Sequence, residues 1–174
     1  VIEIAREDFW PSYEFGAPPS PNRDASSFVC VRMKGVQELV MDIFKSAAAA
    51  GVILAVLDFL WLGVIAKGWL AQQLGPLMRE QIMPLPAIAF YLLYAVGLGF
   101  FAVLPSLVDG DWMRALGVGA FFGLVAYGTY DLTNLATLKD WPLPMVIVDL
   151  VWGAVLSGVS AAGGVLLLKQ FGWA

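Results

Sequence analysis

Three aspartates lie inside long apolar stretches of this sequence, at Asp58, Asp131 and Asp149. An ionised aspartate at the centre of a membrane helix costs roughly 2.5–3.5 kcal/mol on insertion scales. Asp58 and Asp131 lie beyond the middle of their stretches, and Asp149 lies near the start of its own. If these stretches cross a membrane in alternating directions, all three aspartates fall in the same half of the bilayer. We therefore expect their carboxyl groups to point inward and to share one polar pocket.

Aromatic and amide side chains accompany the aspartates at helical spacing. Asp58 is followed three residues later by Trp61, and Asp149 by Trp152. Residues three or four apart lie on the same face of a helix. Asp131 belongs to a polar stripe with Tyr127 and Asn134, and two tyrosines of another stretch fall in the same half. The predicted pocket is built by Asp58, Asp131, Asn134 and Asp149 and walled by Trp61, Tyr91, Tyr94, Tyr127 and Trp152.

The chemistry open to such a pocket depends on how its negative charge is compensated. None of the four apolar stretches contains Lys or Arg. A carboxyl can then be protonated and donate a hydrogen bond, or a cation, a cationic head group or a chain of water can compensate it. Four interpretations stay open: a structural lock, a site that loads a proton or small cation, a general acid or base acting on a lipid-like substrate, and an oxygen-ligand site for Mg²⁺, Ca²⁺ or Mn²⁺. We assign no catalytic residue, metal ligand or cofactor.

The elements that must position these side chains are transmembrane helices. The chain has 174 residues, of which 60% are hydrophobic and only 14% are charged, whereas soluble domains carry about 25% charged residues. A helix needs about 20 apolar residues to cross a bilayer, and short connections make neighbouring helices antiparallel. We therefore predict an all-α fold, a four-transmembrane-helix bundle. The predicted spans are residues 46–66, 85–108, 115–138 and 145–168.

Composition also excludes several functional classes. A net charge of −4 gives no basic surface for nucleic acid. Histidine is absent and Cys30 is the single cysteine. Internal disulfides, Cys/His zinc sites, His-ligated haem and Ser-His or Cys-His catalytic pairs are therefore excluded.

The amino-terminal part of the chain has a different character. Residues 1–35 are rich in proline and charge and lack helical periodicity, so we predict an irregular polar arm, and we expect a short interfacial helix from Val36 to Phe44. The arm either binds a partner or results from an alternative start codon, with Met33 or Met41 as the true beginning. From residue 36 onward we predict the transmembrane domain.

Small residues and interfacial residues indicate how the helices pack and face. Close helix packing is expected at Gly119 and Gly123 on the third span and at Gly153, Ser157 and Ala161 on the fourth. Trp69 and Trp141 are expected at one membrane interface, and Trp112 and Trp173 at the other. Five basic residues against three favour a cytoplasmic location for both termini. The five are Arg32, Lys34, Lys45, Arg114 and Lys169, and the three are Lys67, Arg79 and Lys139.

Four sequence strings resemble a bacterial membrane family, the domain of unknown function 2177. They are Asp58-Phe-Leu-Trp-Leu-Gly63, Phe90-Tyr-Leu-Leu-Tyr-Ala-Val-Gly97, Tyr127-Gly-Thr-Tyr-Asp-Leu-Thr-Asn-Leu-Ala-Thr-Leu-Lys-Asp-Trp-Pro142 and Val148-Asp-Leu-Val-Trp-Gly153. The resemblance covers about Lys45 to Leu168, and the string around Asp131 is its most specific part. It implies a four-span inner-membrane protein and carries no mechanism. The long amino-terminal arm departs from the family's usual short start.

The sequence favours a small multi-pass protein of the bacterial inner membrane, and we lean towards a non-enzymatic function. The pocket would bind a proton, a cation or a lipid head group. The alternative is an accessory subunit of a larger membrane complex, which contacts its partners through the arm and the small-residue helix faces. A lipid-modifying enzyme ranks third. The expected partners are the lipid bilayer and, under the alternative, other membrane subunits, but no nucleic acid.

Overall fold

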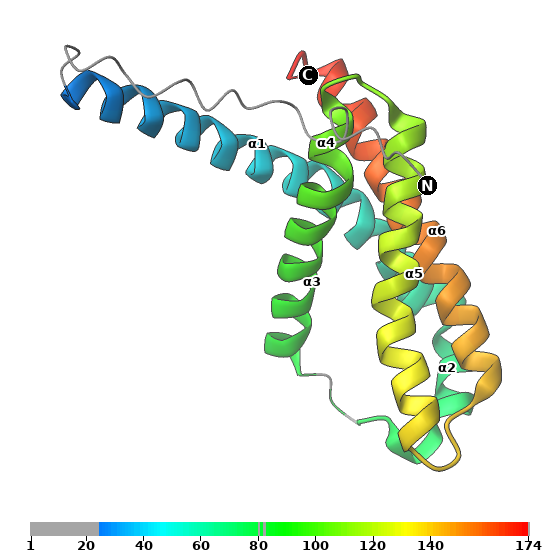
Figure 1. Ribbon diagram of the computed structural model, residues 1–174. Helices are drawn as coiled ribbons and strands as arrows, with labels where there is room; N and C mark the ends of the chain where they lie inside the picture. The colour runs from blue at the N-terminus through cyan, green and yellow to red at the C-terminus, as the bar shows by residue number, and fades with distance from the viewer. Residues whose placement is uncertain (1–24, 80, 82, 174) are drawn as a thin grey trace, which may run out of the picture.

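The chain folds into helices joined by short connections (Figure 1). The structure is a computed structural model, and it describes residues 25–79, 81 and 83–173. The elements in chain order are α1 (Ala25–Leu60), η1 (Trp61–Ile65), α2 (Lys67–Leu74), η2 (Gly75–Leu77), α3 (Pro84–Leu98), η3 (Gly99–Val103), α4 (Leu104–Leu107), α5 (Trp112–Thr137) and α6 (Leu143–Gln170). No strand occurs within these described ranges.

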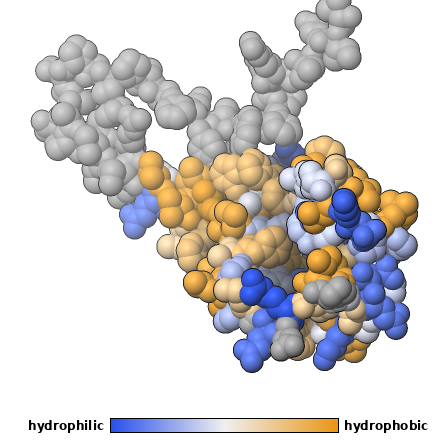
Figure 2. Space-filling model, turned by 90° about the horizontal axis from the view of Figure 1, so that it is seen from below, coloured by the Kyte–Doolittle hydropathy of each residue, from blue (hydrophilic) through white to orange (hydrophobic). Residues whose placement is uncertain are grey.

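Four helical segments are long and apolar enough to cross a membrane, which confirms the predicted all-α four-helix architecture. Many of their large apolar side chains are exposed, as lipid-facing surfaces require. In Figure 2, which views the molecule from below, hydrophobic residues cover much of the surface and hydrophilic residues gather mainly toward the right and lower edges. The four segments are Gly35–Ile65, Pro84–Leu107, Trp112–Thr137 and Leu143–Gln170.

Helix α1 differs from the expectation for the amino-terminal arm. The irregular arm was expected over residues 1–35 with a separate helix from Val36, whereas α1 runs without a break from Ala25 to Leu60. Nothing in the sequence ends the helix here, because no proline occurs between Pro21 and Pro76. The first half of α1 projects away from the other helices (Figure 1). Residues 1–24 of the expected arm lie outside the described residues.

Helices α5 and α6 approach closely because small residues face each other along their contact. A Cβ added at Gly119 would lie only 2.7 Å from the Ser157 carbonyl oxygen and 2.7 Å from the Ala161 Cβ. A Cβ added at Gly123 would collide with the backbone of Gly153. All five of these residues are buried. The small-residue faces are therefore used within the chain and do not face outward toward a partner helix.

Two of the spans contain a π-helical turn. In η1 the Ala66 amide donates to the Trp61 carbonyl at 2.7 Å, and in η3 the Leu104 amide donates to the Gly99 carbonyl. Pro105 gives a local cause for the second turn, because proline has no amide hydrogen for an ordinary helical hydrogen bond and its ring crowds the preceding turn. Each π turn inserts one extra residue into its span.

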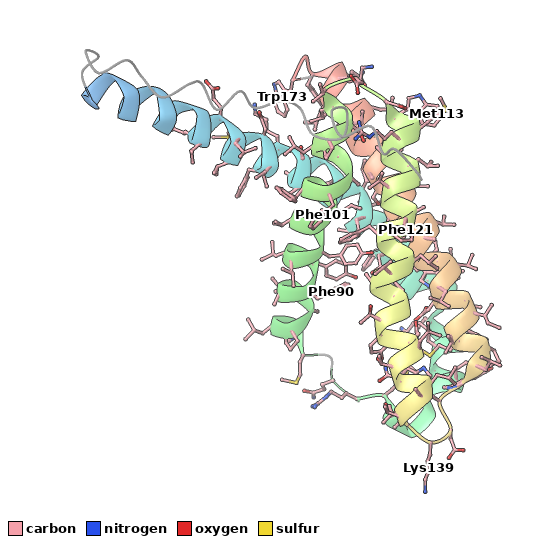
Figure 3. All side chains as sticks on the ribbon, viewed as in Figure 1. Phe90, Phe101, Met113, Phe121, Lys139 and Trp173 are labelled. Atoms are coloured by element: carbon pink, nitrogen blue, oxygen red, sulfur yellow. The ribbon has the colours of Figure 1, made fainter. Side chains whose placement is uncertain are left out.

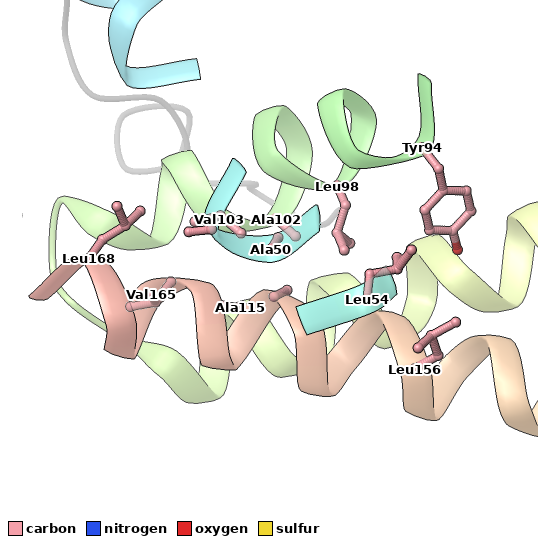
Figure 4. Close-up of a cluster of buried hydrophobic side chains, with 12 residues drawn as sticks. Ala50, Leu54, Tyr94, Leu98, Ala102, Val103, Ala115, Leu156, Val165 and Leu168 are labelled. Atoms are coloured by element: carbon pink, nitrogen blue, oxygen red, sulfur yellow. The ribbon is translucent and has the colours of Figure 1, made fainter. Parts of the chain in front are cut away.

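The buried apolar core lies where α1, α3, η3 and α6 meet. Figure 4 shows Leu54 of α1, Leu98 of α3 and Leu156 of α6 among the side chains of this core. All three are essentially inaccessible. Figure 3 places Met113 and Trp173 at one end of the bundle and Lys139 at the other. Since α1 ends at Leu60 and α6 begins at Leu143, the candidate aspartates lie toward the Lys139 end.

Candidate functional site

Asp58 joins three helices through its carboxyl group. It lies near the end of α1, and its side chain is 4% exposed. The Tyr91 hydroxyl of α3 donates to Asp58 Oδ2, and the Trp152 indole Nε1 of α6 donates to Asp58 Oδ1 at 3.1 Å. Each carboxyl oxygen therefore accepts one hydrogen bond from an uncharged donor. Hydrogen bonds between spans are among the contacts that hold membrane helices together.

The two tryptophans of the Asp-x-x-Trp pairs stack on each other. The Trp61 and Trp152 ring centroids are 4.4 Å apart, with 14° between the planes. Trp61 is the first residue of η1, directly after α1 ends. The indole Nε1 of Trp61 has no hydrogen-bond partner among the described residues, whereas that of Trp152 is bonded to Asp58. The stack therefore places the Trp61 ring against the indole that is bonded to Asp58.

Tyr94 makes a second polar bridge between α3 and α6. Its hydroxyl lies 2.7 Å from the Ser157 Oγ, and both side chains are buried. Its ring meets those of Phe122 and Tyr127 edge-on, with centroids 5.3 and 6.4 Å apart. Sequence reasoning placed Ser157 only at a packing face and missed this role. A serine in a row of small residues is also a hydrogen-bonding group, and that was the available signal.

We call these residues the acidic–aromatic cluster. Its members come from all four helical spans and lie around the Asp58 carboxyl. They are Asp58, Trp61, Tyr91, Tyr94, Tyr127, Trp152 and Ser157.

Asp149 lies at the edge of the acidic–aromatic cluster. Its half-buried carboxyl lies within electrostatic reach of those of Asp58 and Asp131. Tyr127 of α5 lies within the same electrostatic reach of Asp58 and Asp149. Asp149 is therefore connected to the Asp58 site through electrostatics.

Asp131 and Asn134 lie apart from the hydrogen bonds of the cluster. The Asp131 side chain is 0% exposed, and neither of its oxygens has a hydrogen-bond partner in the described part of the chain. Its neighbour is the Trp141 indole, whose buried Nε1 is likewise unpaired. Asn134 interacts instead with the Tyr130 hydroxyl. Sequence reasoning missed both Trp141 and Tyr130 as neighbours of this stripe.

Comparison with known families decides where this chain belongs. The predicted membrane protein family DUF2177 matches residues 43–166. This chain belongs to DUF2177. The matched segment contains every member of the acidic–aromatic cluster, as well as Asp131, Asn134 and Asp149. No curated protein and no solved structure matches the chain.

Ion pairs of this DUF2177 member lie away from its acidic–aromatic cluster. Within the described residues they are Lys45–Asp42 at 3.3 Å and Arg114–Asp109 at 3.7 Å, both outside the cluster. Among the same described residues, no three or more His, Cys, Asp or Glu side chains are grouped so that they could hold a metal ion. The Asp58 carboxyl group is thus held by uncharged hydrogen-bond donors.

Proposed function

We propose that this protein takes up and releases a proton at Asp58 inside the acidic–aromatic cluster. The observation that carries the proposal is the environment of the Asp58 carboxyl group. Asp58 is only 4% exposed, it accepts hydrogen bonds from Tyr91 and Trp152, and it takes part in neither of the two ion pairs described above. Removing an ionised group from water is costly unless it is paired or neutralised. A proton is the simplest group that neutralises a carboxylate.

In both protonation states the Asp58 carboxyl group can stay hydrogen-bonded to the same two neighbours. The ionised carboxylate accepts from the Tyr91 hydroxyl and the Trp152 indole. When a proton binds Oδ2, the new O–H can donate to the Tyr91 oxygen, because a phenol hydroxyl is both donor and acceptor and its hydrogen can rotate. Trp152 continues to donate to Oδ1. The exchange requires rotation of one hydroxyl hydrogen and no movement of a helix.

The aromatic rings favour a proton over a larger occupant. Trp61 stacks on Trp152, and the Tyr94 ring meets the rings of Phe122 and Tyr127 edge to face. A metal ion or lipid head group would require space and several ligand atoms next to Asp58. A proton requires only the carboxyl oxygen.

Two further carboxyl groups suggest a route between Asp58 and water. Asp149 lies in electrostatic reach of both Asp58 and Asp131, and the neighbour of Asp131, Trp141, belongs to the connection between α5 and α6. Chains of acidic side chains mark proton pathways in membrane proteins. We propose that protons enter from this end. If the protein lies in a bacterial inner membrane with both termini in the cytoplasm, as the count of basic residues favours, this end faces away from the cytoplasm.

Infrared difference spectroscopy tests the proposal on the reconstituted protein. Stepping the pH should reveal the carbonyl stretch of a protonated carboxylic acid in a dry environment. We expect Asp58→Asn to remove this band, because Asn keeps the shape and the acceptor oxygen but cannot titrate. Asp140→Asn is the matched control, since Asp140 is exposed and has a positive φ of 60° that asparagine tolerates.

The result is decisive in either direction. Loss of the band in Asp58→Asn and its retention in Asp140→Asn support a proton site. A spectrum of Asp58→Asn that equals the wild type, or the lack of any titrating carboxyl band in the wild type, contradicts it.

A specific surface favours a role as accessory subunit as the second candidate. Val36 and Val40 of α1 are 53% and 56% exposed, and this part of the helix projects from the bundle (Figure 1). Under this candidate, extraction in mild detergent should recover the chain in a heavier particle. The variant Val36→Ser/Val40→Ser should release it, whereas Val125→Ser/Val151→Ser, at valines 52% and 61% exposed elsewhere on the bundle, should not. Recovery of the wild type as a monomer argues against this role.

A further inference from the structure

An apolar groove runs between α1 and the carboxyl-terminal part of α6, far from the acidic–aromatic cluster. Its volume is about 370 Å³, at the lower end of the range for small-molecule sites. It lies at the end of the bundle where Figure 3 places Trp173. The groove is lined by Met41, Phe44, Lys45, Ala48, Ala49, Val52, Leu167, Leu168, Phe171 and Trp173.

Lys45 is the one charged residue of this lining. Its Nζ lies 3.3 Å from Asp42 Oδ1 and 5.8 Å from the centre of the Trp173 ring. An ammonium group has three N–H donors, and Asp42 accepts one of them. A positive charge with further donors therefore lies beside a tryptophan at the rim of an otherwise apolar groove.

This combination matches the two halves of a phospholipid. Tryptophan is enriched at the level of lipid head groups, and the groove continues from there along the apolar helices. Basic residues near a membrane surface attract anionic lipids. We propose that the groove binds one acyl chain of an anionic phospholipid, with the phosphate placed at Lys45. The proposal is independent of proton binding at Asp58.

A second groove on the bundle provides an internal comparison. It lies between α5 and α6, has a volume of about 240 Å³ and contains no charged side chain. It offers lipid tails an apolar surface without an electrostatic contact for a head group. Its lining residues are Leu116, Ala120, Ala154, Val155, Gly158 and Val159.

Native mass spectrometry tests the lipid preference. The full chain is incubated with equal amounts of phosphatidylglycerol and phosphatidylcholine, and the retained lipids are counted. We expect phosphatidylglycerol to be retained about fivefold better, the effect typical of one basic residue near a membrane surface. Lys45→Gln should abolish the preference, and Asp42→Asn should increase it because the competing carboxylate is gone. Lys67→Gln, at the exposed start of α2, should leave it unchanged.

A variant that fills the groove distinguishes lipid bound at this site from lipid that contacts the protein surface in general. Ala48 is exposed and lines the groove, so Ala48→Phe should occupy it without disturbing the core and should reduce retention of both lipids. Ala154→Phe, in the second groove, should preserve the preference. Equal retention of the two lipids by the wild type, or an unchanged preference in Lys45→Gln, overturns the proposal.

A photo-crosslinking amino acid at Met41, on the rim, identifies the occupant directly. We expect an adduct with the mass of a phospholipid. An adduct with residues 1–24 of the same chain, or with a second copy of the protein, would show that another occupant fills the groove and would overturn the proposal.

Discussion

Gly123→Ala should lower the free energy of unfolding by about 3 kcal/mol, at the upper end of the range for overpacked sites. The added methyl group would collide with the Gly153 carbonyl and the Ser157 Oγ across the contact between α5 and α6. One of these obstacles is backbone, so the two helices themselves must separate. Separation would also loosen the contact between Tyr127 and Gly153, where the tyrosine side chain packs directly against the glycine. Reversible unfolding in mixed micelles, followed by circular dichroism, measures the change.

Gly117→Ala on the same helix is the matched control. No neighbouring atom lies within 4 Å of a Cβ at Gly117. Alanine there should be neutral or stabilising by roughly 0.5–1 kcal/mol, because glycine weakens a helix interior. Helix propensity favours alanine at both positions, so if both variants lose the same stability, the described close contact between α5 and α6 does not explain the loss at Gly123 and is wrong.

Asp131→Ala and Asp58→Ala should change stability in opposite directions. Asp131 is fully buried, and neither of its oxygens makes a hydrogen bond of good geometry among the described residues although the Trp141 indole lies close, so its removal should stabilise the fold by at most about 1–3 kcal/mol. Asp58 accepts from Tyr91 and Trp152, so its removal leaves two donors unpaired. We expect Asp58→Ala to cost about 2–6 kcal/mol, on the basis of 1–3 kcal/mol for each of the two donors left unpaired.

The same micelle assay checks both aspartate variants. Because the substitution is identical at the two positions, differences in side-chain size cancel in the comparison. Destabilisation by Asp131→Ala would mean that its carboxyl has a stabilising partner. If Asp131→Ala is more stable and yet abolishes proton exchange at Asp58, the orphaned carboxyl is kept for function at the expense of stability.

The architecture could be predicted because membrane insertion imposes strong rules. Long apolar stretches without Lys or Arg must be helical, and short connections between them force antiparallel neighbours. The first half of α1 was the exception. Its sequence from Ala25 to Gly35 lacks proline but also lacks a clear apolar stripe, so neither periodicity nor a helix-breaking residue marked where the helix begins.

Residue types identified much of the acidic–aromatic cluster, but not its pairings. The spacing Asp58–Trp61 and Asp149–Trp152 suggested two equivalent units, each on its own helix face. In the structure Asp58 bonds to the tryptophan of the other unit, and the two indoles stack. Which side chains meet across a helix contact depends on the rotation and depth of each span. Rotation and depth are set by how the helices pack together, so the spacing of residues within one helix does not predict them.

Depth also explains why Asn134 lies apart from Tyr127 despite sharing its helix face. Seven residues advance a helix by about 10 Å, which exceeds the reach of an asparagine toward a site centred on Asp58. Asn134 therefore meets Tyr130, one turn away, and Asp131 between them is left beside Trp141. A stripe on one face indicates a common direction but not a common site.

The π turns at Trp61–Ile65 and Gly99–Val103 change how the two spans must be drawn on a helical wheel. Each extra residue turns everything after it by about 100° relative to an uninterrupted α-helix. A helical wheel that starts from Asp58 gives correct positions only up to Leu60. A wheel that includes Tyr94 gives correct positions up to Leu98, and a new wheel is needed from Leu104. Relatives that lack either turn should align with this chain only when a one-residue gap is opened at that point.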